Sequence, residues 1–145
     1  MTATPDLRVE RWVAASPEHV YRYLTESDLW ALWQGVAASH DPRPGGLFRL
    51  QMANGMTARG QFLTLEPNRR VVFTWGWIDH PGLPPGSTTV EIELIPGEGG
   101  TLIRLTHRGL PEDETPVHRT GWEHYLLRLA RVSTGDDPGT DPGPS

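Results

Sequence analysis

Short segments with alternating apolar and polar side chains fill most of this sequence, and one long segment with helical spacing follows them. The alternation is clear at Phe48, Leu50 and Met52, and it recurs at Val71 and Phe73. A period of two places one face of a strand against a core and leaves the other face to solvent. Turn-forming sequences separate the segments, so consecutive strands are expected to pair as hairpins. The pattern therefore favours an antiparallel sheet packed against a single helix.

Two helix starts precede most of these strands. Ser16 is suited to cap a helix that begins at Pro17, and Glu18 faces the positive end of its dipole. A second short helix is predicted from about residue 25, with three apolar side chains on one side: Leu29, Leu32 and Trp33.

Most of the strands follow these helices. Asn54-Gly55 predicts a two-residue hairpin turn between two of them. Strands are expected at 7–14, 47–52, 56–65, 71–77, 87–95 and 101–108, and a long helix from 115 to about 132.

This order of elements defines an α+β architecture in one domain. Residues 1–132 are predicted to form the domain, and residues 133–145 a flexible, disordered tail that has no apolar side chain to bury. A sheet that curls over a single helix often leaves part of its concave side unfilled. That space is the natural place for a ligand.

Composition excludes several classes of mechanism. The 145 residues include no cysteine and no lysine, and all 13 basic side chains are arginine. Disulfide frameworks, thiol nucleophiles, cysteine-based metal sites and Schiff-base lysines are therefore absent. The net charge of −5 includes −3 from the tail, so the body carries −2 and shows no basic stripe for nucleic acid. No apolar run approaches a membrane span and the amino end lacks a secretory signal, so we expect a cytoplasmic protein.

Six stretches, in order along the chain, resemble the family of proteins similar to the Hsp90 ATPase activator homologue 1 (AHSA1-like), in the START/Bet v 1-like (SRPBCC) superfamily. The match covers about residues 7–131, and the stretches are 15–21 (ASPEHVY), 29–33 (LWALW), 41–48 (DPRPGGLF), 66–75 (EPNRRVVFTW), 105–110 (LTHRGL) and 121–129 (GWEHYLLRL). The resemblance implies a helix-grip fold, in which a curved antiparallel sheet of about seven strands wraps around the long C-terminal helix, with two short helices after the first strand. It also implies a role in stress response and an apolar cavity, since members of the superfamily bind lipids, hormones or other apolar molecules and some are cyclases or related enzymes.

Large side chains on the inward-facing sides of the strands and the long helix are the candidate ligand-binding residues. Rings of this kind either pack the core or line a pocket, and the sequence leaves both interpretations open. Met52 and Met56 would suit a pocket that adapts to its guest. The candidates are Trp33, Phe48, Leu50, Met52, Phe62, Phe73, Trp75, Trp77, His107, Trp122, Tyr125 and Leu126.

His107 and Arg59 are the candidates for catalysis. His107 lies on an apolar strand face, so it is either a hydrogen-bonded core residue or a group that orients a ligand or transfers a proton in the cavity. Arg59 lies on a strand whose two faces differ little in polarity, so it is either a surface residue or an anchor for an anionic group. His118 and His124 are six residues apart on the predicted helix and point to different sides, so we expect no metal site and no cofactor.

The leading hypothesis is a carrier or sensor that binds a small hydrophobic ligand in a cavity between the sheet and the C-terminal helix. One alternative is a cyclase- or dehydratase-type enzyme that uses polar groups in the same cavity. The other is an interaction with Hsp90, although the sequence shows no Hsp90-binding domain before this one, which argues against full co-chaperone activity. The expected partner is a small apolar molecule, with no nucleic acid and no membrane span, and the protein is expected to be a monomer or homodimer.

Overall fold

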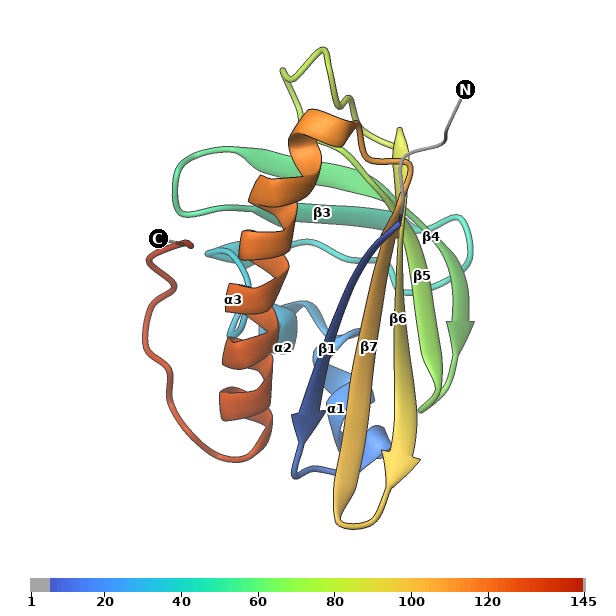
Figure 1. Cartoon of the computed structure of the whole chain (residues 1–145), viewed down its shortest axis with the longest axis vertical. Coiled ribbons are helices and arrows are strands. Elements are labelled where there is room, and N and C mark those ends of the chain that lie inside the picture. Colours follow the sequence, from blue (N-terminus) through green and yellow to red (C-terminus); the bar gives the residue numbers. More distant parts are fainter. Residues whose placement is uncertain (1–5, 145) are drawn as a thin grey trace.

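The fold is a curled antiparallel sheet with one long helix across its concave side (Figure 1). The computed structural model describes residues 6–144. Two parts of the chain lie outside the described residues. They are residues 1–5, where the predicted domain begins and where a secretory signal was not expected, and Ser145. The elements are β1 (Leu7–Val13), α1 (Pro17–Tyr23), α2 (Ser27–Trp30), β2 (Ala37–Ala38), β3 (Leu47–Gln51), β4 (Thr57–Glu66), β5 (Arg70–Trp75), β6 (Thr88–Gly97), β7 (Gly100–Arg108), the 3-10 turn η1 (Glu112–Glu114) and α3 (Thr115–Ser133).

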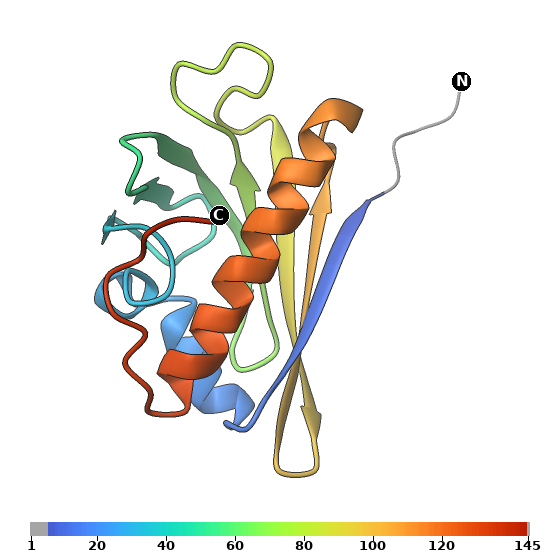
Figure 2. The ribbon, with the colours of Figure 1, turned by 60° about the vertical axis from the view of Figure 1, so that its left-hand side comes forward.

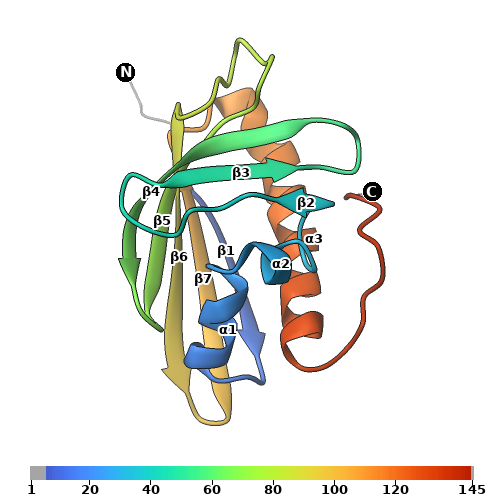
Figure 3. The same ribbon diagram turned by 180° about the vertical axis from the view of Figure 1, so that it is seen from behind.

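The seven strands follow the order β1-β7-β6-β5-β4-β3-β2, and neighbouring strands are antiparallel. Their register aligns buried apolar side chains across the sheet: Val9 pairs with Leu105, Leu105 with Ile92, and Ile92 with Val71. Figure 2 shows α3 lying against this sheet, and Figure 3 shows β3 crossing the direction of the long strands. The predicted α+β helix-grip fold is thereby confirmed.

The short helix α1 begins as the sequence predicts. The side chain of Ser16 accepts a hydrogen bond from the amide of His19, and Pro17 occupies the first turn. The second helix differs from the prediction, which placed Leu29, Leu32 and Trp33 on one apolar side. The helix α2 is a single turn that ends at Trp30. Trp30 and Trp33 are fully buried, whereas Leu32 is 45% exposed.

The hairpin loop between β3 and β4 is also one residue longer than predicted. The amide of Met52 donates to the carbonyl of Met56, which leaves Ala53, Asn54 and Gly55 as the loop. The side chain of Asn54 accepts from the Met56 amide, and Gly55 has a positive φ of 89°. A left-handed residue at the third position is typical of three-residue hairpin loops, so Gly55 serves this turn as well as it would a two-residue turn.

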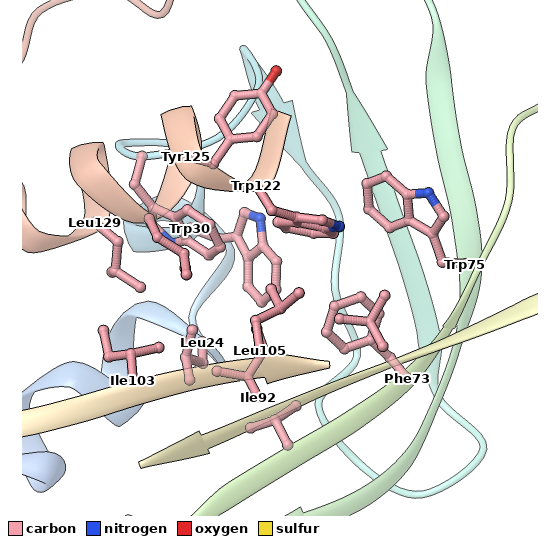
Figure 4. Close-up of a cluster of buried hydrophobic side chains, with 14 of the residues drawn as sticks. Leu24, Trp30, Phe73, Trp75, Ile92, Ile103, Leu105, Trp122, Tyr125 and Leu129 are labelled. Carbon is pink, nitrogen blue, oxygen red and sulfur yellow. The ribbon is translucent and has the colours of Figure 1, made fainter. Parts of the chain in front are cut away.

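Aromatic rings fill much of the interior below α3. Phe48 and Phe73 stack with centroids 4.2 Å apart, and Trp30 meets both rings edge-on. Figure 4 shows Leu24 and Trp30 in this cluster, with side chains of β6, β7 and α3 around them. Because α1 and α2 insert these side chains into the concave side, that part of the interior is packed core.

The predicted flexible tail differs from expectation where it contacts the body. Arg128 of α3 donates to the carbonyls of Pro138 and Gly139, and Asp141 is 3% exposed. Figure 3 shows the segment turning back at the end of α3 and running alongside that helix. A charged anchor and main-chain acceptors replace apolar contacts here, which is why apolar content alone gives no indication of this docking.

No helix among residues 6–144 is long and apolar enough to cross a membrane.

Candidate functional site

A cavity of about 390 Å³ lies between the amino-terminal half of α3 and the sheet. Its walls come from the β3–β4 hairpin, the end of β5 and the loop after it, α3, the segment after α2, and the carboxyl-terminal segment. Met56 and Val117 are exposed at its rim, whereas Trp75 and Trp122 are buried. The lining residues are Gln34, Met52, Ala53, Asn54, Met56, Trp75, Trp77, His80, Glu114, Val117, His118, Gly121, Trp122, Tyr125, Pro142, Gly143 and Pro144.

Four of the lining side chains are aromatic rings set at angles to one another. The ring of Trp75 lies 5.2 Å from that of Trp77 and 5.2 Å from that of Trp122, with interplanar angles of 81° and 53°. Tyr125 meets Trp122 edge-on at 6.4 Å. Figure 4 shows Trp122 reaching from α3 toward Trp75, with Tyr125 beyond it. Angled rings of this kind present both faces and edges to a guest molecule.

A cluster of polar side chains lies at the mouth of the cavity. His80 is hydrogen bonded through Nε2 to Oε1 of Glu114, at 3.0 Å. His118 is 2.8 Å from the Glu114 carbonyl through Nδ1, and its Nε2 accepts from the indole N–H of Trp77 at 3.2 Å. These partners fix His118 as a neutral ring with its proton on Nδ1, and burial lowers its pKa.

The histidines of this cluster do not form a metal centre. Both ring nitrogens of His118 already have partners. Across residues 6–144, no three His, Asp or Glu side chains are grouped so that they would hold a metal ion.

His107 lies outside the cavity, in a continuous chain of hydrogen bonds. The indole N–H of Trp122 donates to Nδ1 of His107 at 3.0 Å. The Thr88 hydroxyl donates to the Trp75 carbonyl at 2.8 Å and is 2.8 Å from Nε2 of His107, so it accepts the Nε2 proton. The core interpretation of His107 is therefore the one that the geometry supports, and the chain ties α3 to β5, β6 and β7.

Five of the predicted binding residues line the cavity: Met52, Trp75, Trp77, Trp122 and Tyr125. The other seven are fully buried and absent from the lining: Trp33, Phe48, Leu50, Phe62, Phe73, His107 and Leu126. Arg59 is exposed on β4, opposite Arg49 of β3, and is also absent from the lining. Neither candidate for catalysis, His107 or Arg59, is thus part of the cavity lining.

Sequence reasoning missed the polar part of the site. Glu114 directly precedes the long helix. Its place in the sequence therefore indicated that it lies at the end of the helix that borders the cavity. His80 lies in a Pro- and Gly-rich loop that no periodic pattern orients. Gln34 was missed as well; its Oε1 accepts from the indole of Trp30, at 3.0 Å, beside the cavity.

The carboxyl-terminal segment completes one side of the cavity. Oδ1 of Asp141 is 2.9 Å from Nε2 of His124, and Oδ2 accepts from the Gly35 amide at 3.1 Å. The backbone amide of Gly143 also donates to Asp141. This anchoring places residues 142–144 in the cavity wall.

The fold and site define a class of protein: α+β domains in which a curled sheet grips a C-terminal helix beside an aromatic cavity. The chain belongs to the family described as Activator of Hsp90 ATPase homolog 1-like protein, whose model matches residues 14–134. Among curated relatives, it is 29% identical over 121 residues to the human protein "Activator of 90 kDa heat shock protein ATPase homolog 1". That match covers 83% of this chain but 34% of the relative, so the chain spans about a third of its length.

Solved structures share the fold over nearly the whole chain. An AHSA1-like protein of Rhizobium etli is 42% identical, with a TM-score of 0.75 over 97% of this chain and 91% of that one. The Aha1 dimer of Colwellia psychrerythraea, at 22% identity, has a TM-score of 0.80 over 95% of this chain and 100% of that one, a likeness of fold alone.

Two tryptophans of the cavity wall should differ sharply in their contribution to stability. Trp122→Phe leaves Nδ1 of the buried His107 without its donor. The buried N–H of Trp75 has no partner within residues 6–144, so Trp75→Phe removes an existing cost. An unsatisfied buried polar group costs about 1–3 kcal/mol, so Trp122→Phe should lose that much more stability than Trp75→Phe. Urea unfolding followed by circular dichroism at pH 7.5 measures the difference; equal losses would contradict it.

The stability of the fold should fall as the pH drops below about 6.5. Burial and the nearby His118 lower the pKa of His107 to about 3, and burial lowers that of His40 to about 4. Between those values and the ordinary pKa the unfolded chain binds protons that the folded chain does not, so the free energy of unfolding decreases with falling pH. Urea unfolding between pH 7.5 and 4 measures this slope for the native chain and for His107→Gln. The slope should be smaller in the variant; an unchanged slope would show that His107 is not its source.

Proposed function

We propose that this protein binds a small apolar molecule in the cavity between the sheet and α3, as a carrier or sensor. The observation that carries the proposal is the concentration of Trp75, Trp77 and Trp122 with Met52 and Met56 around one opening. A volume of about 390 Å³ is in the range of small-molecule sites, about 300–1,000 Å³. Apolar walls with a few placed polar groups are typical of such sites.

The enzymatic alternative has less support. A cyclase or dehydratase that uses His107 or Arg59 needs these groups at the cavity, and neither lines it. Both ring nitrogens of His107 are engaged in the core, so its protonation would break the bond from Trp122. Binding without turnover is therefore the function that these positions favour.

Ligand binding can be tested with N-phenyl-1-naphthylamine, an uncharged fluorescent probe, by fluorescence titration and calorimetry. Gly121→Leu adds a side chain beside Tyr125 and Pro144, whose atoms lie 3.9 Å from the position of an added Cβ. We expect saturable binding of one probe per chain, weakened at least about tenfold, or about 1.4 kcal/mol, by this variant.

Leu127→Gln is the matched control, since Leu127 is exposed on α3 and is not part of the lining. It should bind the probe like the native chain. Absence of binding across a panel of uncharged aromatic and aliphatic probes would contradict the proposal, as would equal affinities of the native chain and Gly121→Leu. Native mass spectrometry of freshly purified protein is a separate measurement that would detect any molecule bound during purification.

A second candidate, interaction with Hsp90, is favoured by the name and identity of the human relative. We propose it as a role of the surface, separate from the cavity. Purified chain should then bind a purified Hsp90 and change its rate of ATP hydrolysis in a coupled assay. If neither binding nor a change in rate is observed, this candidate fails and the cavity proposal is unaffected.

A further inference from the structure

The cavity wall contains an acidic side chain but no arginine. Glu114 is the one carboxylate among the lining residues, and none of the 13 arginines of the chain is among them. The loop and turn that form the mouth, residues 77–80 and 112–118, also carry Asp79, Glu112 and Asp113 and no arginine. Apart from the histidines, every ionisable side chain of these two segments is therefore acidic.

The carboxylate of Glu114 has one hydrogen-bonded oxygen and one oxygen without a hydrogen bond among the described residues. Its Oε1 is hydrogen bonded to His80, which holds the side chain at the mouth. Its Oε2 is 3.6 Å from Nδ1 of His118, which is directed at the Glu114 carbonyl, 2.8 Å away. Within residues 6–144, no hydrogen bond to Oε2 is formed, so this oxygen is available to a donor on a bound molecule.

The aromatic walls favour a positive charge in the same place. The faces of indole and phenol rings attract cations, and the attraction is strongest for Trp. Trp77 is held by its hydrogen bond to His118, so its ring lies next to the Glu114 side of the cavity. An ammonium group at the Glu114 carboxylate would therefore lie in a cavity with aromatic walls.

Two features would favour an acceptor or an anion: the indole N–H of Trp75 in the cavity wall, which has no partner in the described part of the chain and which a neutral acceptor would also satisfy, and the amino terminus of α3. Helix amino termini stabilise nearby negative charge. Glu114 directly precedes the first residue of α3, so its own carboxylate already occupies that region. A second anion would meet this charge at close range in a partly desolvated site, where charge interactions are stronger than in water.

We infer that the molecule bound in this cavity carries a positively charged nitrogen on an aromatic or aliphatic body, with the ammonium group at the carboxylate of Glu114. The inference rests on the proposed function and specifies its ligand class. It separates this site from one for fatty acids or other lipophilic anions.

Three probes with the same apolar body test the charge directly: 2-naphthylmethylamine as the cation, 2-naphthylmethanol as the neutral analogue and 2-naphthoate as the anion. Calorimetry at pH 7.5 and fixed salt gives their affinities for the full chain. The amine should bind about tenfold more tightly than the alcohol, or about 1.4 kcal/mol, and the naphthoate more weakly than the alcohol.

Glu114→Gln keeps the size of the side chain and an acceptor for His80 but removes the charge. It should abolish the preference for the amine over the alcohol. Glu112→Gln is the matched control, because Glu112 is an exposed acid in the same turn and is not a lining residue. It should keep most of the preference.

The outcomes separate the two proposals. If the three probes bind with equal affinity, or the naphthoate binds most tightly, the ligand site stands and the inferred charge is wrong. A preference that persists in Glu114→Gln would also overturn the inference. If none of the three probes binds, the proposed function itself fails.

Discussion

The hydrogen-bond chain from Trp122 through His107 and Thr88 to the Trp75 carbonyl is the contact on which the rest of the structure depends. The contact is specific because neutral His107 accepts at Nδ1 and donates at Nε2, so only one tautomer fits. It positions α3 against three strands and orients the ring of Trp122. That ring is also a cavity wall, so the same bonds that hold the helix determine the shape of the cavity.

The fold was predictable because local signals agree with the tertiary structure. Alternating side chains in β3 and β5 face the core, and the cap at Ser16 starts α1. The length of α2 was not predictable, since Trp30 and Trp33 are both fully buried although the helix ends at Trp30. Tertiary packing overrides helical periodicity in so short an element.

Which aromatic residues belong to the core and which line the cavity could also not be predicted from the sequence. Phe73 and Trp75 lie on the same face of β5, yet only Trp75 reaches the cavity. The difference arises from what packs on each residue. Trp30 of α2 meets the ring of Phe73, whereas Trp75 packs against Trp77 and Trp122, which line the cavity. Strand periodicity gives the face of a residue but not the element that will cover it.

The position of the cavity follows from how the concave side is filled. The two short helices occupy the space at one end of the sheet, and the long helix spans both ends (Figure 2). At the other end α3 and the loops cover the sheet. Arg128, in the carboxyl-terminal half of α3, binds the carbonyls of Pro138 and Gly139 in the tail and that of Trp33. Four backbone carbonyls, including that of Leu32, accept from this one buried guanidinium, so its charge is well solvated by main-chain dipoles. The tail therefore closes a wall that the sheet and helix leave open, and it does so through polar contacts that leave the apolar rings of the cavity free for a guest.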